Sequence, residues 1–229
     1  MKKKFVGFGE ILLRMSPDGY LRFAQADRFN LSYSGAEGNM AVALSYMGLP
    51  TEMVTKLPDN EIGRCAKRAL DKWSVGTSHI AWGGERLGLY YLERGASQRP
   101  SKVIYDRKHT AISEADPSDF NWDEIFADAA WFHFTGITVA LSENLRKICE
   151  DACIAAKRHG VRVSCDLNYR KTLWSVEEAQ AAMKPLMAYV DVLIANEEDA
   201  EKSLGIKAEN TDVTQGKLSV EGYQALAER

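Results

Sequence analysis

Hydrophobic and polar positions in the second half of the chain alternate between two periods. Short apolar runs typical of buried strands occur at 131–134, 161–165 and 190–195. Between the first two, the segment 142–159 places apolar residues at helical spacing, and Gly160 is a plausible end for that helix. Ser175 with Glu178 forms a capping box that opens the next helix. Repeated strand–helix units of this kind predict an α/β fold, in which helices cover a parallel sheet.

The first part of the chain begins with the same kind of pattern. Buried strands are predicted at Lys4–Phe8 and Thr51–Leu57. We expect Asn39 to cap a helix over 40–47, and a second helix is predicted over 60–73. The two strands would join the same sheet, and the two helices would cover it.

Two stretches, at about 11–34 and 87–107, do not fit this alternation. Residues 29–33 alternate apolar with polar, as a half-buried strand does, and 87–94 and 102–107 suggest two strands joined by a polar loop. The pattern predicts a small separate antiparallel sheet, which could act as a lid over the larger one.

The chain ends within a predicted helix at 219–229, with no stop signal and no strand after it. From this we expect a truncated chain. A parallel sheet that lacks its last elements would expose an apolar face, so we also expect marginal stability or association with another chain.

Composition places the chain among ordinary globular proteins. Of its 229 residues, 45% are apolar and 27% are charged, and the net charge of −3 indicates no nucleic-acid partner and no acidic membrane. The first apolar run is too short for a signal peptide, and none approaches a membrane span, so we expect a cytoplasmic protein. The four cysteines form no CxxC pair, and we interpret Cys149 and Cys153, which are four positions apart, as buried thiols on an apolar helix face.

Polar residues follow three of the predicted strands. They are Thr135-Gly136, then 166–170, and then 196–199. Ligands of open parallel sheets bind beyond the carboxyl ends of the strands. Acidic, amide and guanidinium groups gathered there would suit an anionic ligand with a metal ion. Asp166 and Asn196 could equally well serve only to cap the loops that follow.

A glycine-containing loop, 34–38, precedes the predicted helix. Its backbone amides could bind hydroxyls or an anion, or the loop could simply be a tight turn. Gly7-Phe8-Gly9 follows a strand but does not continue as a dinucleotide fingerprint, since position 12 is Leu12 and another strand follows. No Walker A sequence is present.

Tyr90, Tyr105 and Arg107 lie on the predicted lid. They could hold a small polar ligand with a carboxylate, because arginine pairs with carboxylate in a bidentate manner. They could also be ordinary strand tyrosines with a solvated arginine. The four histidines show no metal-ligand spacing, and we interpret them as structural.

Several motifs, in order along the whole chain, resemble the PfkB (ribokinase-like) carbohydrate kinases. The first PfkB signature is matched by 34–44 with 47–49, and the segment after it by 57–63. The motifs at 9–17, 104–107 and 166–174 are most similar to the 2-keto-3-deoxygluconate kinase branch. The resemblance implies a three-layer α/β/α core with a small β-sheet lid, within one domain over 1–229.

The resemblance also implies roles for particular residues. Substrate contacts are expected from Gly35, Ala36, Asn39, Tyr90, Tyr105, Arg107, Ile137 and Arg170, with Arg107 facing the substrate carboxylate. Contacts to ATP are expected from Asn168, Arg170 and Asn196. Glu197 and Asp199 are the candidates for Mg²⁺, but which carboxylate among 197–199 serves the metal stays open because the family's Asn-x-x-Glu motif has Asp199 in its last position.

The implied activity is ATP-dependent phosphorylation of an acid sugar, with 2-keto-3-deoxygluconate as the expected substrate and the 6-phosphate as product. Open alternatives are another PfkB kinase, for fructose, ribose or a nucleoside, and a non-catalytic protein that binds sugar acids. The family's second signature, with its Gly-Ala-Gly-Asp catalytic segment, is absent from these residues, so we expect this chain to be inactive. The family resemblance further implies a homodimer that forms through the lid.

Overall fold

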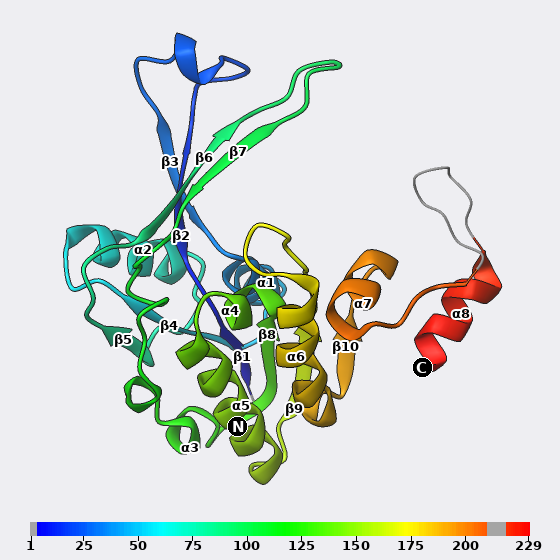
Figure 1. The fold of residues 1–229 in the computed structure, drawn as a ribbon. Coiled ribbons are helices and arrows are strands. Elements are labelled where there is room, and N and C mark those ends of the chain that lie inside the picture. The colour runs from blue at the N-terminus through cyan, green and yellow to red at the C-terminus, as the bar shows by residue number, and fades with distance from the viewer. Residues whose placement is uncertain (1–3, 210–218) are drawn as a thin grey trace.

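Two β-sheets organise the computed structural model, which describes residues 4–209 and 219–229 (Figure 1). The strands of the large sheet are β1 (Lys4–Phe8), β4 (Thr51–Leu57), β5 (Ile80–Trp82), β8 (Ala129–Thr135), β9 (Arg162–Asp166) and β10 (Val192–Ile194). They lie in the order β10-β9-β8-β1-β4-β5, and every pairing is parallel. The parallel sheet predicted from the strand–helix alternation is therefore confirmed.

Helices cover both faces of this sheet. They are α1 (Ala36–Tyr46), α2 (Glu61–Asp71), α3 (Trp122–Ile125), α4 (Gly136–Ala140), α5 (Glu143–Arg158), α6 (Val176–Leu186) and α7 (Glu197–Leu204). Helix α8 (Val220–Glu228) lies beyond the β10 edge of the sheet (Figure 1). Alternate side chains of β1 point to opposite faces of the sheet. Val6 and Phe8 therefore belong to one buried cluster and Phe5 to the other. The Val6 cluster includes side chains of α5 and α6, and the Phe5 cluster includes those of α1 and α2. The expected three-layer α/β/α core is confirmed.

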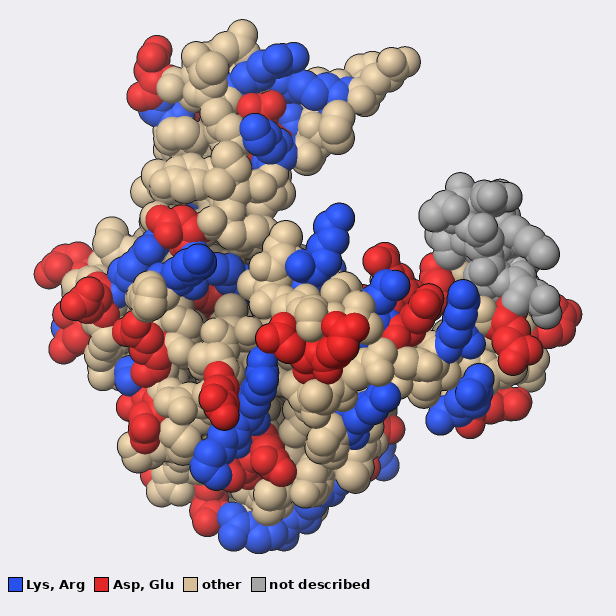
Figure 2. All heavy atoms as spheres, in the orientation of Figure 1, with Lys and Arg blue, Asp and Glu red and all other residues tan. Residues whose placement is uncertain are grey.

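The small sheet consists of β2 (Leu12–Ser16), β3 (Asn30–Ser34), β6 (Gly88–Glu93) and β7 (Lys102–Asp106). Its order is β3-β2-β6-β7, and it projects from the core (Figures 1 and 2). The prediction of an antiparallel sheet was wrong in part, because the central pair β2 and β6 is parallel. These two strands continue from β1 and β5, which run in the same direction and leave the core at the same edge. They therefore enter the small sheet pointing the same way.

The start of α1 also differs from the prediction. Helix α1 begins at Ala36 with Gly35 as its N-cap residue, and the amide of Asn39 donates to the carbonyl of Gly35 over 2.8 Å. Asn39 therefore lies in the first turn of the helix and does not cap it. The glycines at 35 and 38 suggested a loop, but both lie in the packed start of the helix. A side chain on Gly35 would overlap the backbone of Glu10, and one on Gly38 would meet the end of the Ile11 side chain.

One face of the large sheet carries an apolar groove of about 380 Å³ on the α1 side of β8, β9 and β10. Trp131, Val192 and Ile194 line it, and the three residues of β10 are each exposed by about two fifths. The sequence predicted an exposed apolar sheet face, and this groove has that character. No helix among the described residues is long and apolar enough to span a membrane.

His133 is buried on the same side of the sheet as Trp131. Its Nδ1 lies 2.8 Å from Oγ of Ser164, which also accepts a hydrogen bond from Nε1 of Trp131 over 2.7 Å. Burial lowers the pKa of His133 from its ordinary 6.5 to about 4. The imidazole is therefore neutral in the folded protein at neutral pH, as the structural interpretation of the histidines requires.

This pKa difference predicts acid sensitivity. Because the unfolded state binds more protons than the folded state between pH 6.5 and 4, stability falls as pH drops through this window. We expect His133 alone to remove about 2 kcal/mol of unfolding free energy between pH 7 and pH 5. Urea denaturation of His133→Gln should show a smaller loss over this range than the wild type. His109→Gln, at an exposed position, is the matched control, and a loss in His133→Gln equal to that of the control would contradict the assignment.

Candidate functional site

A pocket of about 190 Å³ lies where the small sheet meets the carboxyl ends of β1, β8 and β9. Its walls come from both sheets and from the first turns of α1 and α4. All eight residues predicted to contact substrate line it: Gly35, Ala36, Asn39, Tyr90, Tyr105, Arg107, Ile137 and Arg170. Asn168, predicted to contact ATP, lines it as well. The structure thus brings together residues up to 135 positions apart in sequence, while their individual roles stay predictions.

The two tyrosines come from neighbouring strands of the small sheet. Tyr90 of β6 pairs in register with Tyr105 of β7, and their ring centroids are 5.7 Å apart. The hydroxyl of Tyr90 lies 2.8 Å from Oγ of Ser34 at the end of β3. Their aromatic surface and hydroxyls give this wall of the pocket the mixed character that suits a polyhydroxylated ligand.

The opposite wall depends on Gly35. Its backbone is extended, with φ −166° and ψ 157°, so no unusual conformation demands glycine here. The demand is for space, because a Cβ would overlap the carbonyl oxygen of Glu10. This close approach seats the N-terminus of α1 against the end of β1, where the first amides of the helix face the pocket.

Arg107 directly follows β7 and is largely buried. Its Nε donates to Oε2 of Glu10 over 2.9 Å, and its Nη2 contacts the same oxygen. Oε1 of Glu10 accepts a hydrogen bond from the hydroxyl of Thr110 over 3.1 Å. The guanidinium also lies over the ring of Tyr105, 5.4 Å from the ring centroid. The open alternative of a solvated arginine is therefore wrong, since Arg107 is ion-paired within the pocket wall.

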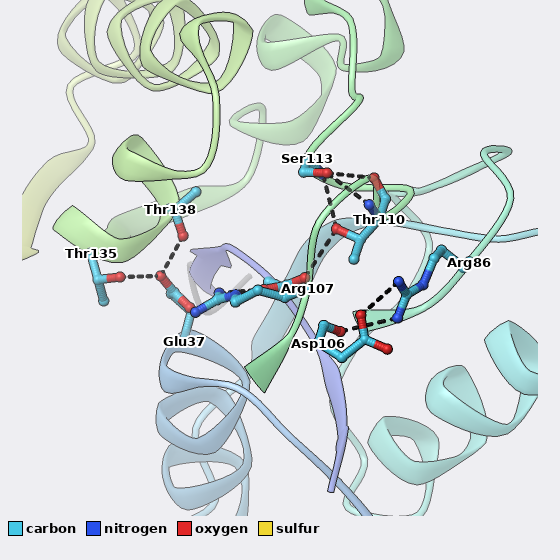
Figure 3. Close-up of polar contacts among 9 residues, drawn as sticks. Glu37, Arg86, Asp106, Arg107, Thr110, Ser113, Thr135 and Thr138 are labelled. Atoms are coloured by element: carbon cyan, nitrogen blue, oxygen red, sulfur yellow. Dashed lines mark hydrogen bonds and ion pairs between the residues drawn. The ribbon is translucent and has the colours of Figure 1, made fainter. Parts of the chain in front are cut away.

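A second buried carboxylate, that of Glu37, lies beside this ion pair. It comes from the first turn of α1, and its Oε1 accepts hydrogen bonds from the hydroxyls of Thr135, over 2.7 Å, and Thr138, over 2.8 Å. Figure 3 shows Glu37 between these two threonines and Arg107. Burial raises the pKa of Glu37, and it also raises the pKa of Glu10 despite the charge of Arg107.

Sequence reasoning did not assign Glu10 or Glu37 to the site. Glu10 could have been noticed because it closely follows a buried strand, at the edge where ligands bind. Glu37 offered a weaker signal, an acidic residue within an otherwise small and apolar segment. Their hydrogen-bond partners lie 97 to 101 residues further along the chain.

The residues at 196–199, predicted to contact ATP and the metal, do not line the pocket. Asn196 caps α7 through its side chain, and Oδ1 of Asp199 accepts a hydrogen bond from the amide of Tyr169 over 2.9 Å. The capping role that was left open for Asn196 is thus present, and ligand contact stays a prediction. Asp166 is close enough to Asp199 that burial and the charge of Asp199 raise its pKa. The polar groups that follow β9 and β10 therefore do gather at one edge of the large sheet.

Magnesium fits this edge only in part. No group of three or more histidine, cysteine, aspartate or glutamate side chains suited to a metal occurs among residues 4–209 and 219–229. The carboxylate of Asp199 also already accepts hydrogen bonds from the backbone amides of Tyr169 and Asn196. A cation here would need ligands from elsewhere, such as nucleotide phosphates. The assignment of Glu197 and Asp199 stays a prediction.

Comparison with known proteins identifies relatives of this arrangement. A model of the pfkB family carbohydrate kinases matches residues 2–222. A 2-dehydro-3-deoxygalactonokinase of Haloferax volcanii is 40% identical over 200 residues, which are 87% of this chain and 62% of that protein. The crystal structure of a 2-dehydro-3-deoxygluconokinase from Thermotoga maritima has a TM-score of 0.94 and 54% identity, over 99% of this chain and 68% of that one. The chain thus spans 62% of the length of the curated relative, and the fold is the ribokinase-like α/β fold that the sequence predicted.

The packing of Gly35 generates a testable prediction. Gly35→Ala must push the start of α1 away from the end of β1, and overpacking of this kind destabilises by about 1–3 kcal/mol. Gly7→Ala is the matched control, because a Cβ on Gly7 would meet no atom closer than 3.4 Å. Urea denaturation should show the loss for Gly35→Ala alone. Equal stability of the two variants would refute the close approach as the reason for glycine.

Proposed function

Because the chain belongs to the pfkB family of carbohydrate kinases, we propose that the whole protein transfers a phosphoryl group from ATP to a hydroxyl of an acid sugar. The expected substrate is 2-keto-3-deoxygluconate (2-dehydro-3-deoxygluconate) and the expected product its 6-phosphate. The names of the two relatives support this class of substrate. The observation that carries the proposal is Arg107, a buried guanidinium in the wall of a pocket otherwise built for hydroxyl groups.

The pocket favours an acid over a neutral sugar. A carboxylate that reaches Arg107 gains a charge-assisted hydrogen bond inside a shielded site, which a neutral sugar cannot form. Tyr90, Tyr105 and Asn39 provide the remaining hydrogen-bonding groups. Fructokinases are also among the relatives, for example one of Zea mays at 29% identity, and a fructose-type substrate is the alternative that the experiment below must exclude.

In this proposal the residues of the chain position the acceptor sugar. The small sheet acts as a lid that covers the bound sugar and excludes water. The first amides of α1 orient a hydroxyl, and Arg170 stabilises the negative charge that develops on the transferring phosphoryl group. ATP with Mg²⁺ would supply the phosphoryl group. The family's Gly-Ala-Gly-Asp segment does not occur in these 229 residues, so we expect this chain by itself to bind the sugar without turning it over.

The small sheet also supports a homodimer. Leu31 and Ile104 lie on the face opposite the pocket, in register with Met15 and Tyr91, and both are exposed. Between its tip and the core, the visible surface of the small sheet is largely uncharged (Figure 2). An exposed apolar sheet face of this kind favours pairing with a second copy.

The substrate assignment predicts the behaviour of an arginine variant. We expect the whole protein to phosphorylate 2-keto-3-deoxygluconate in preference to fructose, ribose and adenosine. Arg107→Ala should weaken binding of the acid sugar by about 2–5 kcal/mol, because Glu10 and the substrate carboxylate both lose their partner. The effect should appear mainly as a higher KM. Steady-state kinetics of both proteins would measure this. Preference for a neutral sugar, or an unchanged KM in the variant, would contradict the assignment.

The dimer proposal predicts that one face of the small sheet is sensitive to charge. Ile104→Lys should shift the protein toward monomers at micromolar concentration in sedimentation velocity. Val103→Lys is the matched control, because Val103 is exposed to a similar extent, 43% against 45%, but belongs to the face that carries Tyr105. A monomeric wild type, or equal behaviour of the two variants, would count against assembly through this face.

A further inference from the structure

Three ionisable side chains that converge on the pocket carry an unbalanced charge. Glu10, Glu37 and Arg107 all line it, and the two glutamates are only 3% and 2% exposed. Arg107 forms its ion pair with Glu10. Among the described contacts, the side-chain partners of Glu37 are the hydroxyls of Thr135 and Thr138, which are neutral. When both glutamates are ionised, this buried cluster carries one positive and two negative charges, and the other charged residue that lines the pocket, Arg170, is exposed.

Other charged groups near the pocket do not remove this excess. Arg86 acts on Glu10 from a distance, but it is paired with Asp106 at 2.8 Å. Arg170 also lines the pocket, but it is exposed, and its Nη1 donates to the carbonyl of Tyr169. The phenols of Tyr90 and Tyr105 also line the pocket. The buried thiols of Cys149 and Cys165 interact with Glu37, and because burial raises their pKa they add no charge near neutral pH.

A sugar carboxylate that binds Arg107 would bring a third negative charge to one guanidinium. In a site shielded from water, several negative charges around one guanidinium repel one another strongly. A proton that neutralises one of them removes this repulsion. Resting on the proposed function, we propose that Glu10 determines how the pocket accepts an acid sugar: its carboxylate competes with the substrate for Arg107, and it yields by taking up one proton from solvent.

The hydrogen bonds around Glu10 offer a place for this proton. Oε2 of Glu10 faces Arg107, whereas Oε1 faces the hydroxyl of Thr110 at 3.1 Å. Oγ1 of Thr110 already accepts a hydrogen bond from the amide of Ser113 over 3.3 Å, and after the hydroxyl rotates its second lone pair can accept from a proton on Oε1. Oε2 then remains as an acceptor for Arg107. Burial already raises the pKa of Glu10, which brings protonation closer to neutral pH.

The sign of the pH dependence follows from linkage. The sugar carboxylate, with an ordinary pKa of about 3.5, stays ionised throughout the neutral range. If one proton is taken up on binding, the association constant for the acid sugar falls as pH rises, by up to about tenfold per pH unit. A pocket with no coupled carboxylate would show a flat profile between pH 6 and pH 8.5.

The test is isothermal titration calorimetry of the protein with 2-dehydro-3-deoxygluconate, without nucleotide, in phosphate and in Tris at the same pH. The difference in apparent enthalpy between the two buffers counts the protons. For the wild type we expect net uptake, up to one proton, and an affinity that falls from pH 6 to pH 8.5. Glu10→Gln keeps the shape and an acceptor for Arg107 but cannot ionise. It should show no uptake, a flat profile and binding at least severalfold tighter than the wild type at pH 8.

Glu93→Gln is the matched control. Glu93 is a largely buried carboxylate of the same small sheet, paired with Arg99, and it does not line the pocket. This variant should keep the proton uptake and pH dependence of the wild type.

The outcomes separate two failures. If the wild type does not bind the acid sugar at all, the proposed function is wrong. If it binds with the same enthalpy in both buffers, the function stands and this inference is overturned. A folded Glu10→Gln that keeps the wild-type pH profile, or binds the acid sugar less tightly, also overturns it. If Glu10→Gln does not fold, the buffer comparison on the wild type still decides.

Discussion

A buried ion pair between Glu10 and Arg107 fixes the small sheet to the large one. Glu10 lies two residues after the end of β1 in the core, and Arg107 directly follows β7, the last strand of the small sheet. The pair therefore closes a loop of 97 residues at the point where the chain enters and leaves the small sheet. Removal of one partner from a buried pair typically destabilises by about 3–5 kcal/mol, because the other charge stays uncompensated. The position of Tyr105, and with it one wall of the pocket, depends on this contact.

The same region explains why the pocket forms where it does. All strands of the large sheet point their carboxyl ends to one edge, and the chain leaves this edge twice to build the small sheet. Gly35 then returns the chain so closely to Glu10 that only a hydrogen atom fits between them. The first turn of α1 thereby places Glu37 against Thr135 and Thr138, at the end of β8 and in α4. The topology of the sheet and one tight backbone contact together bring these polar groups to the same place.

The sequence predicted the strands of both sheets except the short β5, and most helices, because their signals are local. Asn60, Ser142 and Ser175 cap the helices that follow them, and Gly48, Gly160 and Gly205 adopt positive φ just after helices end. The prediction failed where distant contacts decide. Gly35 and Gly38 suggested a loop because their close neighbours, near Glu10 and Ile11, cannot be seen in a local pattern. The parallel pairing of β2 with β6 likewise depends on where two separate strands leave the core.

The candidate site shows the same division. Tyr90, Tyr105 and Arg107 were recognised from their place on the predicted lid and from the family resemblance. The carboxylates that surround Arg107 were missed because the sequence of a strand end does not reveal its ion pairs. This omission changes the chemistry. A lone buried arginine would destabilise the empty protein, so a pocket of this kind needs a counter-ion before its ligand arrives. That counter-ion then competes with an anionic ligand for the guanidinium. The requirement that the empty pocket be stable thus limits how tightly the pocket can hold its substrate, and a proton that neutralises Glu10 relaxes that limit.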